Sequence, residues 1–369
     1  MRKITKPTLL LDKTKCKRNI DAMLLKAKQH NLLFRPHFKT HQSKTIGEWF
    51  KEKGVNKITV SSIKMAHYFA NDGWNDITLA FPVNILEIDE INKLSKEITL
   101  NLTLLSEENA IFLRNNLKHK VGIFIKIDTG YGRTGLISSD TDKINALLEI
   151  IKLSNKLTFK GFLAHSGNTY HAENTEEIIA IHENSLQELT SLKEKYINDF
   201  PEMIISIGDT PSSTLANNFT GIDEIRPGNF VFYDLMQYNL GVCKFKDIAI
   251  AMACPVVAVH TERNQVIIHG GAVHFSKENI NYKGKTIYGI AAKTEKGKWH
   301  EVNEDIILTS LSQEHGTLTV SDSEINNITI GDIITIIPVH SCLTANLMQA
   351  YLTFDDEEIY HLSSEKAVV

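Results

Sequence analysis

From residue 13 to residue 230 the chain alternates short apolar runs with longer amphipathic segments, and this alternation restricts the possible folds more than any other feature. Parallel strands need a crossover of a dozen or more residues between them, usually a helix, so the pattern predicts repeated strand–helix units. Eight apolar runs are candidate strands: 32–35, 57–60, 77–81, 99–105, 121–128, 158–165, 203–207 and 224–226. Eight such units predict a closed (β/α)8 barrel of the TIM type.

The pattern changes after residue 240 to alternating and β-branched runs, which predict a mainly antiparallel β-domain. The candidate strands there are 248–260, 265–269, 286–290, 306–311, 317–320 and 333–338. We therefore predict an α/β chain with a barrel at 13–240 and a β-domain at 241–369. A short apolar run at 9–12 precedes the barrel and can pair with the β-domain, so we assign residues 1–12 to that domain.

Composition excludes several classes of partner. The formal net charge is −4, so no global basic excess attracts nucleic acid or an anionic membrane. No apolar stretch reaches the about 18 residues of a membrane helix, and the N-terminus lacks the apolar core of a signal peptide. We expect a cytoplasmic protein that acts on a small molecule. The four cysteines are scattered without CxxC spacing, which argues against a disulfide framework or a zinc knuckle.

The first predicted strand ends in the run RPHFKTH at 35–41, which places Lys39 among Arg35, His37 and His41. Neighbouring cations favour the neutral amine of a lysine, and a neutral amine can form a Schiff base. In barrels of this type the functional groups gather at the carboxyl ends of the strands, where Lys39 is predicted to lie. A basic surface turn is the alternative interpretation of the run in isolation.

The fifth predicted strand runs into DTGYGRTG at 128–135, which matches the dinucleotide-binding pattern GxGxxG and has Glu149 about 20 residues further on. A Rossmann site is disfavoured, because four predicted strands precede this one and the loop carries the bulky Tyr131 and Arg133. An ordinary turn is one alternative. We favour another, in which Arg133 projects into the mouth of the barrel.

The loops after the last three predicted strands carry further candidate groups. An imidazole and a phenol can flank a planar ring by stacking and hydrogen bonding, and a glycine and hydroxyl cluster at a helix N-terminus favours a phosphate. Satisfied loop histidines and ordinary helix caps are the alternatives. The candidates are His165 and Tyr170 after the sixth strand, Gly208, Asp209 and Thr210 after the seventh, and Arg226, Gly228 and Tyr233 after the eighth.

The combination is more specific than any of its members. Barrels of this type commonly bind phosphate in the loops after strands seven and eight, and both loops here carry suitable groups. A lysine amine, a phosphate site and aromatic or imidazole neighbours are what a pyridoxal phosphate site requires. The sequence therefore predicts pyridoxal phosphate as the cofactor.

The predicted β-domain contributes a possible metal pair, His340 and Cys342, in the run PVHSCLTAN at 338–346. In an extended segment, residues two apart point to the same side, so this pair can present a nitrogen and a sulfur to one metal ion. The softness of a thiolate favours zinc over magnesium or manganese. A buried thiol beside a hydrogen-bonded histidine is the alternative.

His315 lies in the run QEHG on a predicted turn between two strands. An imidazole next to a carboxylate in such a turn can act as a catalytic acid or base. A solvated hairpin is the alternative.

These motifs, in this order, make the chain similar to the D-threonine aldolase and D-serine dehydratase family of fold-type III pyridoxal phosphate enzymes. The resemblance rests on RPHFKTH, DTGYGRTG, GDTPSS, EIRPGNFVFYD, SQEHG and PVHSCLTANL, and it covers nearly the whole chain. It implies a barrel like that of alanine racemase, a C-terminal β-domain, and a homodimer with the site near the interface.

The resemblance also implies a role for most of the candidates. Arg133 and Arg226 compete for the place beside the pyridine nitrogen, where an arginine would keep that nitrogen unprotonated. The remaining roles implied are the covalent bond to the cofactor for Lys39, the metal for His340 and Cys342, the phosphate for Gly208, Asp209, Thr210 and Tyr233, and an aromatic contact for Tyr170.

The resemblance leaves two lyase reactions open. Family members similar to D-serine dehydratase pair a histidine with a cysteine and use zinc, whereas aldolase members often pair a histidine with an aspartate. The HSC motif therefore favours a D-serine dehydratase, which forms pyruvate and ammonia, over a D-threonine aldolase, which forms glycine and acetaldehyde. A pyridoxal phosphate carrier without catalysis is a third hypothesis, but such a carrier is expected to lack the second domain.

Overall fold

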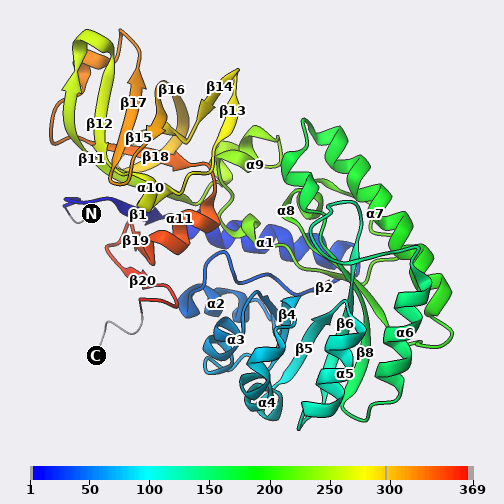
Figure 1. Ribbon diagram of the computed structural model, residues 1–369. Helices are drawn as coiled ribbons and strands as arrows, with labels where there is room; N and C mark the ends of the chain where they lie inside the picture. The colour runs from blue at the N-terminus through cyan, green and yellow to red at the C-terminus, as the bar shows by residue number, and fades with distance from the viewer. Residues whose placement is uncertain (1–2, 296, 365–369) are drawn as a thin grey trace. The chain divides into compact units, whose positions relative to one another are not determined.

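The computed structural model describes residues 3–295 and 297–364 (Figure 1). The remaining residues, 1–2, 296 and 365–369, belong to the predicted β-domain and lie outside the described residues. The chain divides into two compact units. The barrel unit comprises Ala22–Lys39 and Gly47–Gly228, and the β unit comprises Met1–Asp21, Thr40–Ile46 and Asn229–Val369.

The barrel unit is built on a sheet of parallel strands. Its strands are β2 (Leu33–Phe34), β3 (Ile58–Val60), β4 (Asp76–Pro82), β5 (Thr99–Leu104), β6 (Val121–Asp128), β7 (Leu136–Ile137), β8 (Leu157–Ala164), β9 (Ile204–Ile207) and β10 (Glu224–Ile225). Eight of them follow the order β2-β10-β9-β8-β6-β5-β4-β3, and β7 pairs with β6. His37, just beyond β2, forms a parallel bridge with Thr59 of β3, so the two edges of the curled sheet meet.

Helices make the crossovers between these strands. Ser62, Ser106 and Asn174 begin three of the helices, because the side chain of each accepts a backbone N–H of the first turn. The helices of this part of the chain are α1 (Lys13–Gln29), α2 (Lys44–Lys51), α3 (Ile63–Ala70), α4 (Ile88–Glu97), α5 (Glu107–Asn116), α6 (Thr141–Lys152), α7 (Thr175–Tyr196) and α8 (Thr210–Leu215), with the 3-10 turns η1 (Ile85–Glu87) and η2 (Gly167–His171).

The β unit contains a mainly antiparallel sheet. Its strands are β1 (Thr8–Leu11), β11 (Ile250–His260), β12 (Gln265–His269), β13 (Ile280–Tyr282), β14 (Lys285–Ile287), β15 (Gly289–Glu295), β16 (Lys298–Leu311), β17 (His315–Val320), β18 (Ile333–Pro338), β19 (Ala350–Thr353) and β20 (Glu358–Tyr360). The order β12-β17-β16-β15-β18-β11 closes on itself, because β12 also pairs with β11. Strands β1, β19 and β20 extend this sheet beyond β11, and β13 and β14 form a separate hairpin.

Short helical segments of the β unit surround its sheet. Three of them are α-helices and four are 3-10 turns among the described residues. They are α9 (Leu235–Asn239), α10 (Ala272–Phe275) and α11 (Ser341–Met348), with η3 (Asn229–Val231), η4 (Phe245–Asp247), η5 (Thr261–Arg263) and η6 (Ile325–Asn327).

The predicted fold class is confirmed, since a parallel strand–helix barrel and an antiparallel β unit are both present. The N-terminal run also pairs with the second unit, as β1 against β11. The predicted strand 286–290 is wrong, because β14 and β15 separate at Tyr288. The predicted extended segment 338–346 is also wrong, because β18 ends at Pro338 and α11 begins at Ser341. Leucine, alanine and methionine in the 341–348 run favour a helix there.

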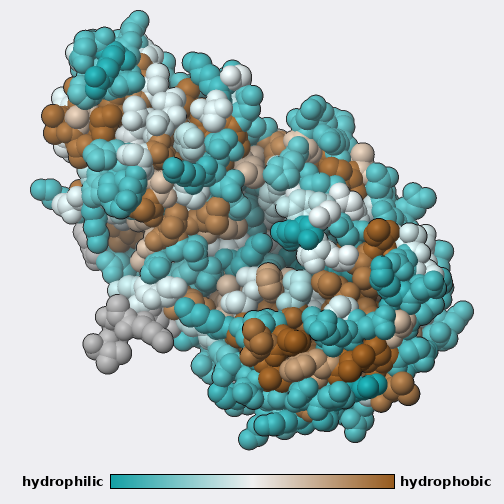
Figure 2. Space-filling model, in the orientation of Figure 1, coloured by the Kyte–Doolittle hydropathy of each residue, from teal (hydrophilic) through white to brown (hydrophobic). Residues whose placement is uncertain are grey.

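The surface carries some apolar side chains. No helix among the described residues is both long and apolar enough to cross a membrane. Figure 2 shows apolar side chains gathered over the part of the barrel unit that contains α4 and α5. Leu86 of η1 and Ile111 of α5, two elements in contact, are 89% and 40% exposed. Such surface can serve an interaction, but the homodimer stays a prediction.

Candidate active site

Five nitrogen-bearing side chains influence one another at the carboxyl ends of the barrel strands. They are His37 and Lys39 beyond β2, Lys126 near the end of β6, His165 beyond β8 and Arg226 beyond β10. Burial lowers the pKa of His37 well below its usual value, and Lys39 and Arg226 lower it further. Burial and then Lys39 lower the pKa of His165 to about 3. Both imidazoles are therefore neutral at pH 7, whereas the side chain of Lys39 is exposed.

Lys126 is a member of this group that the sequence analysis misses. Its side chain is 4% exposed, and burial followed by the charges of Arg226 and Arg133 lowers its pKa to about 8. The signal for it was present in the sequence, because a lysine inside the apolar run VGIFIKID must point into the protein.

The two candidate arginines occupy different environments. Arg226 is 3% exposed, its Nε donates to Ser206 Oγ at 2.6 Å, and its Nη2 donates to the Ala164 carbonyl at 2.6 Å. Burial lowers the pKa of Arg226 to about 10, so the side chain stays charged at pH 7. Arg133 is exposed and lies over the ring of Tyr131, 4.9 Å from its centroid. Arg226 is therefore the fixed, buried cation of the two.

The loop at 128–135 is an Asp-stabilised turn. The Asp128 carboxylate accepts hydrogen bonds from the backbone N–H groups of Gly130, Tyr131 and Gly132 at 2.9–3.1 Å. The chain then forms β7 before α6 begins at Thr141, so β6, the strand that enters this loop, does not run directly into a helix N-terminus. A dinucleotide-binding loop requires that transition, which supports the earlier rejection of a Rossmann site.

Asp209 caps α8 with its side chain. Its carboxylate accepts hydrogen bonds from Ser212 N at 2.7 Å and from Thr169 Oγ1 at 3.1 Å, and burial raises its pKa. Beside it, the Gly208 carbonyl accepts a hydrogen bond from Nδ1 of His165. A phosphate at this loop would therefore meet the backbone of Asp209 and not its carboxylate.

The start of α8 has polar groups that suit a phosphate. The backbone N–H of Thr210 donates to the Tyr170 hydroxyl at 3.2 Å. The hydroxyls of Ser212 and Ser213 are buried and have no hydrogen-bond partner within the described chain. A side chain at Gly208 would collide with Arg226, since a Cβ would lie 2.9 Å from Arg226 Cβ. The glycine thus allows the loop to approach the strand that carries the arginine.

In the β unit, His340 and Cys342 lie at the start of α11. His340 is the N-cap and Cys342 is the second residue of the helix, so a helix start and not an extended strand brings the pair together. Cys342 Sγ lies 3.3 Å from Thr40 Oγ1 and 3.7 Å from Asn229 Nδ2. Burial would lower the pKa of His340, but a hydrogen bond with Cys342 and the charge of that thiol raise it to about 9.

Asp234 supports the segment around Cys342. Its Oδ2 accepts hydrogen bonds from Asn229 Nδ2 at 2.6 Å and from the N–H of Ser341 at 2.9 Å. Tyr233 precedes it and is buried, with a φ of 49° in the left-handed region that bulky residues rarely adopt. Such strain concentrates at functional sites. Gly228, the last residue of the barrel unit, is half-buried.

His315 is exposed at the first position of β17, directly opposite His269 of β12. The neighbouring Glu314 lies 3.7 Å from His269 Nε2 and 3.9 Å from His274 Nε2. His274 Nδ1 accepts the N–H of Gly271 at 3.1 Å, so its Nε2 carries the proton and is not a ready metal ligand. His269, His274 and Glu314 thus form one group of side chains, of which only Glu314 lies in the QEHG run.

The sequence analysis placed Arg35 and His41 beside the amine of Lys39, and this prediction is wrong. Arg35 turns into the barrel and pairs with Asp76 and Glu224. His41 accepts the N–H of Ser43, and burial together with His361 lowers its pKa to about 3. Spacing in sequence was misleading here, because residues 38–41 form a turn, and the even spacing of these side chains does not put them on one side as it would in an extended strand.

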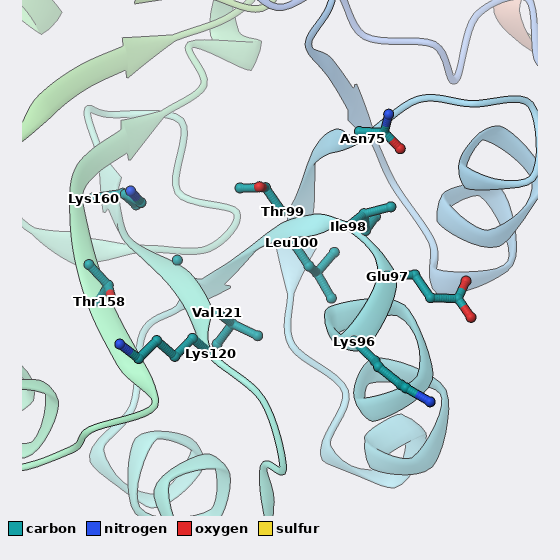
Figure 3. A pocket seen from close by; sticks show the side chains of 11 residues that line it. Asn75, Lys96, Glu97, Ile98, Thr99, Leu100, Lys120, Val121, Thr158 and Lys160 are labelled. Carbon is teal, nitrogen blue, oxygen red and sulfur yellow. The ribbon is translucent and has the colours of Figure 1, made fainter.

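One hollow of the barrel unit lies away from these groups. It has a volume of about 410 Å³ and is lined by residues at the amino ends of β5, β6 and β8 (Figure 3). Figure 3 shows Lys96 and Lys120 extending in opposite directions. Functional groups of such barrels gather at the opposite, carboxyl ends of the strands, so this hollow is not the site.

Two family descriptions match the chain. Residues 11–235 match "Alanine racemase, N-terminal domain", and residues 249–354 match "Putative serine dehydratase domain". These matches confirm the family predicted from the motifs.

Related proteins and solved structures agree with these matches. D-serine dehydratase of Dictyostelium discoideum is 29% identical over 360 residues, covering 88% of this chain and 86% of that protein. The structure of D-threo-3-hydroxyaspartate dehydratase from Delftia sp. HT23 has a TM-score of 0.88 at 25% identity and covers 97% of both chains. D-threonine aldolase from Filomicrobium marinum has a TM-score of 0.84 at 19% identity, covering 99% of this chain and 96% of that one, and shows the fold alone.

We predict that protein stability depends on His41 in mildly acidic solution. The folded pKa of about 3 lies below the usual value of 6.5, so between them the unfolded chain binds more protons and stability is lost as the pH falls. In the variant His41→Asn, the free energy of unfolding should fall less between pH 6.5 and 4.5, by on the order of 1 kcal/mol. Urea unfolding across this range measures the difference.

The control for this experiment is His171→Asn, which removes an exposed imidazole. That variant should keep the pH dependence of the unmodified protein. Equal pH dependence in the His41 variant and the unmodified protein would contradict the prediction.

Proposed function

Because the chain belongs to the alanine racemase N-terminal domain family, we propose that it is a pyridoxal phosphate-dependent lyase acting on D-3-hydroxy amino acids. The proposed reaction is the dehydration of D-serine to pyruvate and ammonia. The observation that carries the proposal is the group of Lys39, His165 and Arg226, in which a neutral imidazole and a buried guanidinium accompany an exposed amine. The related proteins named as D-serine and D-threo-3-hydroxyaspartate dehydratases support it.

The residues of the barrel unit fit pyridoxal phosphate. The unpartnered hydroxyls of Ser212 and Ser213 suit a phosphate at the start of α8. Arg226 is charged and fixed, so it suits the ring nitrogen, which it would keep unprotonated. The cofactor, when bound, supplies an electron sink for the Cα carbon of an amino acid. Lys39 would hold the cofactor and take the proton from Cα.

His340 and Cys342 fit a divalent metal, and the thiolate favours zinc. Their mutual hydrogen bond supports a common ligand position for the nitrogen and the sulfur. Thr40, whose hydroxyl lies 3.3 Å from the sulfur, directly follows Lys39 in the chain. A structure of a related dehydratase is described as the metal-free form of a cysteine-to-alanine mutant, which supports a metal in that protein. A metal here would supply Lewis acidity for the β-hydroxyl of the substrate.

Several earlier assignments stay predictions. They are the homodimer, the cytoplasmic location, the phosphate contact of Tyr233, the cofactor contact of Gly228, and an acid or base role for His315. The exposed position of His315, opposite His269 and next to Glu314, is compatible with proton transfer, because imidazoles and carboxylates are the usual acids and bases of such steps.

The reaction is tested by offering D-serine and D-threonine separately to the purified protein. We expect pyruvate and ammonia from D-serine, and we expect Lys39→Ala to lower kcat by about 10²–10⁴-fold, the usual contribution of a positioned acid or base. Keto acid formation coupled to a reductase assay measures the rate, and Lys64→Ala on the exposed surface of α3 is the control. If the protein forms glycine and acetaldehyde from D-threonine and no pyruvate from D-serine, the proposed dehydration is wrong and the reaction is an aldol cleavage.

The metal is tested by chelation followed by elemental analysis. Removing the metal should lower pyruvate formation from D-serine, and adding zinc should restore it. Cys342→Ala should lose the bound metal, whereas the matched variant Cys243→Ala should keep it, because Cys243 has no role in the proposed site. Full activity in protein shown to be metal-free would rule out the metal's role.

A further inference from the structure

A chain of five polar side chains, four of them buried, crosses the interior of the barrel unit. Arg35 Nη1 donates to Asp76 Oδ1 at 2.6 Å, and Arg35 Nε donates to Glu224 Oε2 at 2.7 Å. Ser206 Oγ donates to Glu224 Oε1 at 2.6 Å and accepts from Arg226 Nε at 2.6 Å. Arg226 is thus connected to Asp76 of β4 through three intermediate residues. We call these five residues the barrel relay.

Glu224 is the central charge of the barrel relay. Its side chain is fully buried, and both carboxylate oxygens are occupied, one by Arg35 and one by Ser206. A buried carboxylate without a partner costs several kcal/mol, so the two guanidinium groups and this carboxylate depend on one another. Burial lowers the pKa of Arg226, and Glu224 acts against this effect.

The far end of the barrel relay is anchored. Asp76 also accepts a hydrogen bond from Asn101 Nδ2 at 3.2 Å and lies 3.4 Å from the Lys57 amine. Asp76 is partly exposed, with 23% of its side-chain surface accessible. The desolvation penalty for its charge is therefore smaller than that for the charge of Glu224. Arg35 is therefore held from both sides and fixes the position of Glu224.

The near end leaves Arg226 with hydrogen-bond donors for a ligand. Its Nε and Nη2 are engaged by Ser206 and the Ala164 carbonyl, but Nη1 has no hydrogen-bond partner among the described residues. A guanidinium has five N–H donors in a rigid plane, so fixing Nε and Nη2 also fixes the direction of the Nη1 donors. The orientation of Arg226 toward any ligand is set by Ser206 and, through it, by Glu224.

We propose that Glu224, acting through Ser206, is the positioning residue that holds the Arg226 guanidinium oriented and charged toward the ring nitrogen of pyridoxal phosphate. This inference rests on the proposed function, which assigns that partner to Arg226. The groups that act electrostatically on Arg226, or on which it acts, come from five segments of the barrel unit. They are Glu224, Arg35, Asp209, Lys126, His37 and His165.

Two variants test the proposal. Ser206→Ala removes the hydroxyl between Glu224 and Arg226, and Glu224→Gln removes the charge while keeping the shape. Each should weaken pyridoxal phosphate binding to the apo-protein by about tenfold or more, which corresponds to about 1.4 kcal/mol per factor of ten. Each should also shift the pH at which the absorption spectrum of the bound cofactor changes.

The matched control is Thr103→Val. Thr103 is also fully buried in the barrel, and its hydroxyl donates to the Leu79 carbonyl at 2.7 Å without any link to Arg226. The control should lose thermal stability as apo-protein but keep the cofactor affinity and spectrum of the unmodified protein. If Glu224→Gln does not fold, Ser206→Ala decides the test alone.

The outcomes separate this inference from the proposed function. Unchanged affinity and spectrum in Ser206→Ala and in any folded Glu224→Gln would overturn the role of Glu224, while leaving a cofactor-binding lyase in place. Failure of the unmodified apo-protein to bind pyridoxal phosphate would instead contradict the proposed function, and the inference with it.

Discussion

The fully buried carboxylate of Glu224 is the constraint on which the polar interior of the barrel unit depends. It joins residues from strands far apart in sequence, because Arg35 follows β2, Ser206 lies in β9 and Arg226 follows β10. Removing one partner of such a buried pair typically costs about 3–5 kcal/mol, since the other charge is then left uncompensated. The Glu224 carboxylate thus connects the Arg35 guanidinium with that of Arg226 through Ser206.

The buried guanidinium of Arg226 affects the protonation of the groups at the carboxyl ends of the strands. Burial and, after it, neighbouring positive charges keep His37 and His165 neutral, so these rings can form hydrogen bonds without adding charge. The same conditions lower the pKa of Lys126 to about 8. Positive charges gathered in this way attract anionic groups.

The sequence was sufficient for the parts of the account that depend on local pattern. Eight apolar runs separated by amphipathic segments predicted the strand–helix barrel, and strand ends located Lys39, His165, Asp209 and Arg226. Prediction from the sequence failed where a contact joins residues far apart in the chain, and where residues close in the chain have different surroundings. Ser206 lies in a short strand outside the motifs, and Glu224 begins the EIRPGNFVFYD motif without any sign of its partners there. His41 does not share the surroundings of Lys39, and the HSC segment starts a helix. Hydrophobic periodicity does not encode which polar side chains meet inside a barrel.

The central claim is that Lys39 holds the cofactor, and Lys126 is the natural competitor because its amine is also close to the same groups. Borohydride reduction of the protein loaded with pyridoxal phosphate, followed by peptide mapping with mass spectrometry, tests this claim most directly. The account predicts a pyridoxyl label on the peptide that contains Lys39 and none on the peptide that contains Lys126. A label on Lys126, with Lys39 unmodified, would contradict it.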